Sequence, residues 1–159
     1  MEDLAIDEIS LDDTQALIIM TKVPNKPGVA ANLFDQIADA GVFVDMIVQS
    51  HASDDVADIA FSVNREDFDH AVATAQAVCD QFGCEGVTSK REIAKLSVSG
   101  VGLRSHTGVA IGMFEALGKA GINLDAINTS EVRVNVIVDG SSGKTAEEAL
   151  KRQFASSLR

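Results

Sequence analysis

Two stretches of the chain share one arrangement about eighty residues apart. The first reads KVPNKPGVAANLF at residues 22–34, and the second reads GLRSHTGVAIGMF at residues 102–114. Each places a glycine directly before an apolar run with helical spacing, which is typical of a strand that turns into a helix. Aligning the sequence with itself at this offset also matches Phe34 with Phe114, Asp45 with Asp125 and Ser50 with Ser130, without a gap. The sequence therefore predicts two copies of one structural unit.

The first copy is expected to have the order βαββαβ of a ferredoxin-like unit. Alternating apolar residues indicate strands, and apolar residues three or four apart indicate helices. Asn64 and Asp67 are expected to cap the second helix, and Gly83 to end it. The predicted strands are 16–23, 42–49, 57–63 and 84–88, and the predicted helices are 29–40 and 68–82.

The second copy ends before its fourth strand. Strands are expected at 96–101, from 122 and at 132–138, and helices around 109–117 and 149–154. In the last strand Val132, Val134, Val136 and Val138 are expected to point inward. Conversely, the apolar Leu4, Ile6 and Ile9 near the start of the chain have no counterpart in the first copy. We expect this leading segment to cover the open edge of the second sheet. The prediction is an α+β fold of two modules, in which module 1 (14–89) is inserted into module 2 (1–13 plus 90–159).

The composition limits the classes of partner. The chain has 159 residues, of which 46% are apolar, and a net charge of -11 with 13 basic residues. Such a charge argues against nucleic acid as a partner, because nucleic-acid readers gather Lys and Arg on one face. The apolar runs are too short to span a bilayer and no signal segment opens the chain, so a cytoplasmic location without a membrane partner is expected. Cys79 and Cys84 are candidates for a redox pair, but in a chain without export signals buried and reduced thiols are expected instead.

The glycine before each predicted helix suggests a binding site for an anion. The first amide groups of a helix have no internal acceptor, the helix dipole adds positive charge there, and glycine permits close approach to the main chain. In the second copy Thr107 replaces Pro27, so the shared feature is the helix start; the alternative is that Pro27-Gly28 only makes a tight turn. Asp45 and Asp125 on the second strands offer carboxylates for an ammonium group. Together these groups indicate a pocket for an α-amino acid.

The segments KPGVAANLFDQIADAGVFVDMIVQS (26–50) and LRSHTGVAIGMFEALGKAGINLDAINTSEVRVNVIVD (103–139) resemble the paired ACT modules of aspartate kinases. The resemblance covers nearly the whole chain and is closest to the regulatory subunit or carboxy-terminal regulatory region. It implies feedback control of lysine, threonine and methionine biosynthesis by lysine or threonine bound where modules meet. It also implies a homodimer and a catalytic kinase subunit, which phosphorylates the aspartate side chain with ATP. The kinase module has no counterpart in this sequence, so we expect neither catalytic residues nor a cofactor or metal in this chain.

The resemblance also assigns two effector pockets. The first would comprise Asn25, Gly28, Val29, Ala30 and Gln49, faced by Asn123 and Leu124 of the partner module. The second would comprise His106, Gly108, Val109, Ala110, Thr129, Ser130 and Glu131, faced by Val44 and Asp45. The family usually has Asp in place of Asn25, Pro or Ala in place of Thr107, and QMIST where this chain has DAINT at 125–129. These departures leave the identity of the effector open.

Other readings of the sequence are weaker. GSSGKT at 140–145 lacks the first glycine of a phosphate-binding loop, and a turn with Thr145 and Glu148 capping the last helix is preferred. HASDDVAD at 51–58 does not have the spacing of a common metal site. His106 has no nucleophile near it in sequence, and an RNA-binding sheet would need aromatic residues that are missing here. An acyl-phosphate hydrolase would depend on Arg104, and a stand-alone ACT protein that regulates another enzyme is a further alternative.

Overall fold

The computed structural model describes residues 6–100 and 106–158. The chain forms two compact units. One unit is contiguous and consists of residues 14–92, and is called module 1 below; the other joins residues 1–13 to residues 93–159, and is called module 2. The chain passes from module 2 into module 1 and back again, so module 1 is an insertion within module 2.

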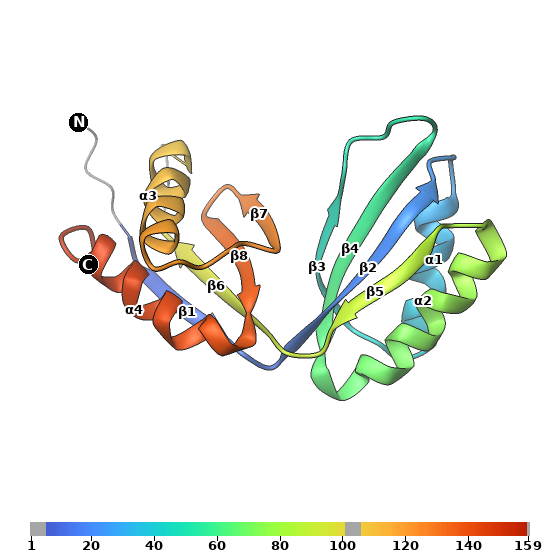
Figure 1. Cartoon of the computed structure of the whole chain (residues 1–159), viewed down its shortest axis with the longest axis horizontal. Coiled ribbons are helices and arrows are strands. Elements are labelled where there is room, and N and C mark those ends of the chain that lie inside the picture. Colours follow the sequence, from blue (N-terminus) through green and yellow to red (C-terminus); the bar gives the residue numbers. More distant parts are fainter. Residues whose placement is uncertain (1–5, 101–105, 159) are drawn as a thin grey trace. The chain divides into compact units, whose positions relative to one another are not determined.

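Module 1 is a four-stranded antiparallel sheet with two helices on one face (Figure 1). The strands lie in the order β3-β4-β2-β5, so that β2 and β4 are central and β3 and β5 form the edges. The helices and strands agree in order and type with the predicted βαββαβ unit. In chain order they are β2 (Gln15–Pro24), α1 (Val29–Asp39), β3 (Val44–Gln49), β4 (Val56–Asn64), the short 3-10 helix η1 (Arg65–Asp67), α2 (Phe68–Phe82) and β5 (Gly86–Lys90).

Module 2 repeats this architecture with one strand supplied from the start of the chain. Strand β1 (Glu8–Asp12) pairs antiparallel with β6, from Glu8 opposite Ser99 to Asp12 opposite Lys95, and gives the order β1-β6-β8-β7. The predicted α+β fold of two ferredoxin-like modules, with the first inserted into the second, is therefore confirmed. The remaining elements are β6 (Ile93–Ser99), α3 (His106–Lys119), β7 (Ala126–Ser130), β8 (Arg133–Asp139), the 3-10 helix η2 (Gly140–Ser142) and α4 (Gly143–Gln153).

The leading segment pairs slightly later than the apolar pattern predicts. Ile6 and Ile9 are buried in the module 2 core, whereas Leu4 lies outside the described residues. Strand β8 buries Val134, Val136 and Val138 as predicted, because alternate residues point to the same face of a strand. Val132 was also predicted to point inward, and this is wrong: it lies in the turn between β7 and β8 and is 47% exposed.

The caps predicted for the helix starts are wrong in both modules, whereas Gly83 ends α2 as predicted. A 3-10 turn precedes α2, and neither Asn64 nor Asp67 makes a side-chain cap hydrogen bond. In module 2, η2 moves the start of α4 to Gly143, so Thr145 lies inside the helix instead of capping it. The side chain of Asp139 instead accepts a hydrogen bond from the Ser141 amide at 3.2 Å. In each module a 3-10 turn thus lies before the helix, at the position where a side-chain cap was expected.

Cys79 and Cys84 form a disulfide, which corrects the expectation of reduced thiols. Gly83 has a left-handed backbone with φ of 78° and ends α2, so the chain reverses immediately before Cys84. The reversal brings the two cysteine Cα atoms to 4.9 Å, within the range that a disulfide requires.

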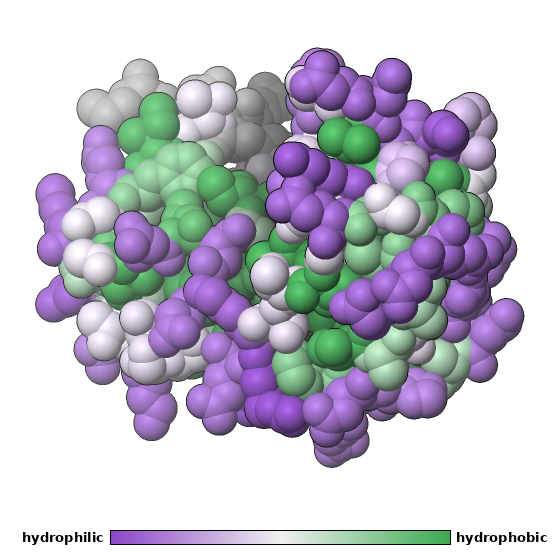
Figure 2. Space-filling model, turned by 45° about the vertical axis from the view of Figure 1, so that its right-hand side comes forward, coloured by the Kyte–Doolittle hydropathy of each residue, from purple (hydrophilic) through white to green (hydrophobic). Residues whose placement is uncertain are grey.

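None of the helices in the described residues is long and apolar enough to cross a bilayer. On the face shown in Figure 2, hydrophobic residues reach the surface between hydrophilic ones. The exposed large hydrophobic side chains include residues on the edge strands and on the outer side of α3. These are Phe43, Ile47, Ile111, Phe114, Ile127, Val132 and Leu158.

Candidate functional site

The start of α1 leaves amide groups without internal acceptors. Gly28 has a left-handed backbone with φ of 91° directly before the helix, and no side chain caps it. The Val29 amide donates to the Lys26 carbonyl at 3.2 Å, and the first regular helical bond runs from the Asn32 amide to the Gly28 carbonyl at 2.9 Å. Between them, the amides of Ala30 and Ala31 donate to no other group in the described part of the chain. Two bare donors at the positive end of a helix dipole suit a carboxylate.

The same end of module 1 also carries Asn25 and Gln49. Strands β2 and β3 each pair antiparallel with β4, so their last residues, Pro24 and Gln49, lie at one end of the sheet. The Asn25 amide donates to the Asp55 carbonyl at 2.8 Å and fixes the turn into α1 against the β3–β4 connection. The structure therefore gathers the five predicted module 1 residues at one end. These are Asn25, Gly28, Val29, Ala30 and Gln49, of which only Val29 is buried and offers its backbone alone.

Charges of both signs lie beside this helix start. Lys26 is exposed in the turn that leads into α1, and Asp54 and Asp55 are exposed in the β3–β4 turn, both with positive φ. Asp58 is exposed at the beginning of β4. An end that combines bare amides with nearby cationic and anionic side chains is suited to a small zwitterion.

Val44 and Asp45 lie at the opposite end of β3 from Gln49. The Asp45 carboxylate accepts a hydrogen bond from the Gln15 side-chain amide at 2.9 Å. This bond holds Asp45 against the beginning of β2. The sequence showed no sign of it, because Gln15 precedes the repeated pattern.

The corresponding helix start in module 2 differs from that of α1. Helix α3 begins at His106, so Gly108 lies in its first turn and not before it, while Val109 is fully buried. The His106 side chain and Arg104 fall outside the described residues, so their predicted roles concern atoms that the structure does not describe. Gly108 and Ala110 thus lie within α3, whereas Gly28 directly precedes α1.

The β7 residues of the predicted second pocket lie at the α3 end of module 2. Ser99, Arg133 and Ser130 form one row across β6, β8 and β7, so the end of β7 lies beside the end of β6, from which the chain proceeds to α3. Thr129, Ser130 and Glu131 are all exposed there. Asn123 and Leu124 instead precede β7 at the other end, where Asn123 is exposed and Leu124 packs against the module 2 core.

The glycine-rich segment before α4 has a packing role. Gly143 is buried, and a Cβ atom at this position would lie 2.9 Å from the Cβ of Ala94. A glycine therefore allows α4 to begin directly against β6. As for the acidic turn at 51–58, no group of three His, Cys, Asp or Glu side chains in the described residues is arranged to hold a metal ion.

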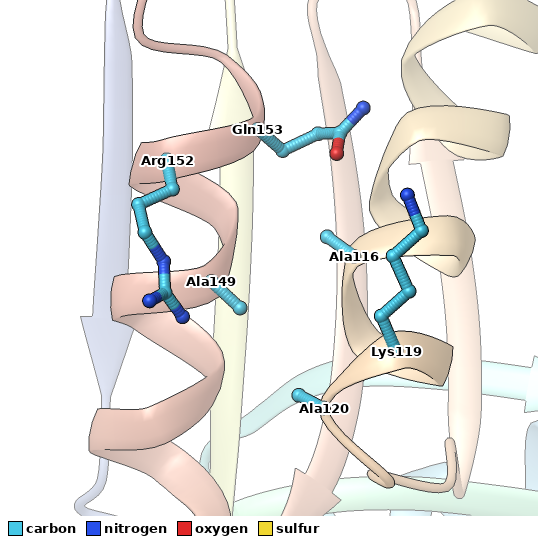
Figure 3. A pocket seen from close by; sticks show the side chains of 6 residues that line it. All are labelled: Ala116, Lys119, Ala120, Ala149, Arg152 and Gln153. Carbon is cyan, nitrogen blue, oxygen red and sulfur yellow. The ribbon is translucent and has the colours of Figure 1, made fainter.

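A groove between α3 and α4 is a feature that the sequence analysis missed. It has a volume of about 310 Å³, and Figure 3 shows alanine side chains between Lys119 on α3 and Arg152 on α4. The lining contains two cations and no carboxylate, although the chain as a whole is acidic. The repeat alignment places Asp39 of module 1 at the position of Lys119, so the positive charge is particular to module 2. The lining residues are Ala116, Lys119, Ala120, Ala149, Arg152 and Gln153.

The paired sheets, each with two helices on one face and an uncapped helix start in module 1, define a protein of two ACT domains. The sequence matches the ACT domain family over residues 18–78 and 96–154. Aspartate kinase Ask_LysC of Stutzerimonas stutzeri (strain A1501) is 40% identical over 154 residues, or 97% of this chain and 37% of the relative. The regulatory subunit of aspartate kinase from Thermus flavus is 34% identical, with a TM-score of 0.87 over 94% of this chain and 99% of that chain. The chain belongs to the aspartate kinase family, as a regulatory subunit or carboxy-terminal regulatory region with two ACT domains.

A solved structure of aspartokinase alpha and beta subunits is similar as well. It is 35% identical, with a TM-score of 0.86 over 95% of this chain and 99% of the matched chain. The chain thus corresponds to nearly the full length of these two solved chains, but to 37% of the length of the Stutzerimonas enzyme.

Proposed function

We propose that the chain senses lysine or threonine, or both, and transmits feedback inhibition to an aspartate kinase. The observation that carries this proposal is the uncapped start of α1, where Gly28 exposes the Ala30 and Ala31 amides at the end of the module that also carries Gln49. The carboxylate of the effector accepts hydrogen bonds from these amides, as anions do at helix starts. The side chains of Asn25 and Gln49 orient the remaining polar groups of the amino acid.

Each pocket is completed by a second ACT module. Asn123 and Leu124 close the first pocket over the amino acid. Val44 and Asp45 close the second, which is formed at the α3 end of module 2. Binding across such an interface stabilises one arrangement of the modules, and the extent of inhibition is set by the difference in effector affinity between the two arrangements. The second pocket comprises His106, Gly108, Val109, Ala110, Thr129, Ser130 and Glu131.

Exposed edge strands suggest a homodimer, and a similar solved structure suggests a catalytic subunit as a second partner. Ile47 on β3 and Ile127 on β7 occupy matching positions in the repeat, and both are exposed on edge strands. Edge strands with exposed apolar side chains favour pairing, so we expect a homodimer joined through the ACT modules. The solved pair of aspartokinase alpha and beta subunits supports association with a catalytic kinase subunit. The reaction controlled in this way is the ATP-dependent phosphorylation of the aspartate side-chain carboxylate.

Calorimetric titration of the chain with lysine and with threonine separately tests the proposal. At least one amino acid is expected to bind, and Gln49→Ala is expected to weaken binding about tenfold, because one hydrogen bond to a charged or polar ligand contributes about 1.5 kcal/mol. Gln76→Ala is the matched control, because Gln76 is exposed on α2 and, among the described residues, its side chain bonds only to Asp80 on the same helix. The affinity of this variant should not change. If neither amino acid binds, with or without a catalytic subunit, the proposal fails.

A further inference from the structure

The Cys79–Cys84 disulfide closes a loop that the backbone already holds in place. The Gly83 amide donates to the Cys79 carbonyl at 2.8 Å, and the Cys84 amide donates to the same carbonyl at 3.1 Å. These two bonds keep the cysteines adjacent whether or not the sulfur atoms are joined. The disulfide is therefore able to open and to form again without unfolding of module 1.

The two sulfur atoms differ in their accessibility. Cys79 lies in the module 1 core and is 3% exposed, whereas Cys84 is only partly buried, next to the core. A thiolate from solution thus reaches the Cys84 sulfur more readily than the Cys79 sulfur. Disulfides that are accessible from one side undergo exchange more readily than those that are fully enclosed.

The residue after Cys84 connects this loop to the irregular part of β2. The Glu85 amide donates to the Thr21 carbonyl at 2.9 Å, and the Glu85 carboxylate forms an ion pair with the Lys22 ammonium at 3.0 Å. Lys22 has a positive φ of 52° and lies at a shift in the β2–β4 register between Met20 and Val23. Glu85 thus supports a bulge in which a non-glycine residue holds a strained backbone.

The opposite side of the bulge is fixed by the β3–β4 end of the module. The Lys22 amide donates to the Asp58 carboxylate at 2.9 Å, and the Asp58 amide donates to the Ser50 hydroxyl at 2.9 Å. Beyond the bulge, β2 continues only to Pro24 before the turn into α1. Figure 1 shows the α2–β5 connection, the end of β2 and the start of α1 at the same end of module 1. The disulfide and the uncapped helix start are therefore joined by a short series of contacts.

We propose that Cys79 and Cys84 form a reversible redox site whose disulfide steadies the Lys22 bulge and, through it, the turn that presents the α1 amides. Opening the disulfide leaves Cys84 held at the end of α2 only by the two backbone bonds to the Cys79 carbonyl. Glu85 is then less firmly placed, and the bulge loosens. The effect on amino-acid affinity rests on the proposed function. The redox chemistry and the loosening of the turn do not.

The exchange reaction requires a dithiol as reductant. One thiolate of the dithiol attacks the Cys84 sulfur, the bond between the cysteines breaks, and Cys79 leaves as a thiolate that takes up a proton. The second thiol of the reductant, after losing its proton, attacks its own sulfur in the mixed disulfide and releases Cys84, which is then protonated. Two electrons pass from the dithiol to the protein, and the products are two cysteine thiols and the oxidised reductant. A low-molecular-weight disulfide reverses the reaction.

The first test counts thiols in the folded chain. The full chain, purified without reductant, is alkylated under native conditions and weighed by mass spectrometry. We expect no alkylated cysteine at first, two after native treatment with dithiothreitol, and none again after oxidised glutathione. The Cys84→Ser variant should carry one alkylated cysteine both before and after dithiothreitol, because Cys79 then has no partner to pair with. Two free thiols before reduction, or a disulfide that opens only in denaturant, would overturn the proposal.

The second test measures the coupling by amide hydrogen exchange. Reduction should increase exchange several-fold in a peptide covering residues 20–30 and leave residues 93–99 of module 2 unchanged. The Cys84→Ser variant should exchange at the reduced rate and not respond to dithiothreitol, whereas Glu85→Gln should speed exchange in residues 20–30 of the oxidised chain. Equal exchange in the oxidised and reduced chains would refute the coupling. Because no amino acid is present in this measurement, its result is independent of whether lysine or threonine binds.

Discussion

Gly28 has a backbone that L-amino acids with a side chain adopt at a cost. Its φ is 91°, and a Cβ atom there would meet no other atom within 4 Å. Backbone strain is thus the whole penalty for Gly28→Ala, and we expect the free energy of unfolding to fall by about 1 to 2 kcal/mol. Urea denaturation measures this loss. Gly86→Ala is the control, because Gly86 also has open space around it but no positive φ, and its variant should be as stable as the parent chain.

A buried hydrogen bond joins two strands of module 2. The Ser97 hydroxyl donates to the Asn135 side-chain carbonyl at 2.6 Å, and both residues are buried. Ser97→Ala removes this donor and should lower the free energy of unfolding by about 1 to 3 kcal/mol. Ser99→Ala, which loses only a 3.5 Å contact with the Glu8 carbonyl, should cost less than about 0.5 kcal/mol. Similar losses in both variants, measured in urea, would rule out a special role for the Ser97 bond.

At this scale, the sequence predicted residues that repeat but not those that depend on local geometry. Gly28 was found because the second copy repeats its pattern, and Gln49 because of the resemblance to the paired ACT modules. The structure places both at one end of module 1. The Cys79–Cys84 disulfide was missed because it depends on the left-handed turn at Gly83 and not on the spacing of the cysteines. The two predicted pockets as complete sites remain predictions.

Two of the three glycines in helix α3, Gly112 and Gly118, lie in opposite environments. A Cβ atom at Gly112 would lie 2.9 Å from the Phe154 ring, whereas one at Gly118 would meet nothing within 4 Å. Both substitutions by Ala gain about 1 kcal/mol of helix propensity, but only Gly112→Ala forces α3 and the residue after α4 apart. Gly118→Ala should therefore raise the melting temperature and Gly112→Ala should lower it. Differential scanning calorimetry of the two variants compares them directly, and equal shifts would contradict close packing at Phe154.

The boundaries of the elements were less predictable than their order. The strand expected from residue 122 begins only at Ala126. The Ile122 amide donates instead to the Leu117 carbonyl and completes the end of α3. Ile122 and Leu124 are apolar because they pack against the core of module 2, and not because they pair in the sheet. An apolar pattern reports burial, which a helix end and a strand produce equally.

The sheet and core of module 2 depend on β1, a strand that precedes module 1 in the chain. Deletion of residues 1–12 removes Ile6 and Ile9 from the module 2 core and leaves one edge of β6 without its partner. We expect module 2 to lose protection from amide exchange in β6, while β2 of module 1 keeps its protection. The matched control is Glu8→Ala, which removes an exposed side chain and leaves the β1 backbone in place. Equal loss of protection in both modules would contradict two separate cores.

The insertion itself was predictable because it follows from counting strands. One repeat lacked its last strand, one leading apolar segment had no repeat partner, and a sheet edge needs a cover. The relative placement of the modules, on which both proposed effector pockets depend, leaves no comparable signal in one sequence.

The pairing of β1 with β6 sets the order in which the two modules fold as the chain emerges from the ribosome. β1 is synthesised before module 1, and its partner β6 is synthesised after it. Glu8 therefore cannot pair with Ser99 until 91 further residues have been made. Module 1 is contiguous and is free to fold in the meantime. Its first and last strands are neighbours, with Leu17 opposite Lys90, so its folding brings β1 and the nascent β6 to within about two strand spacings, roughly 10 Å. The inserted domain thus acts as a folding template that replaces a long, entropically costly search by a short one.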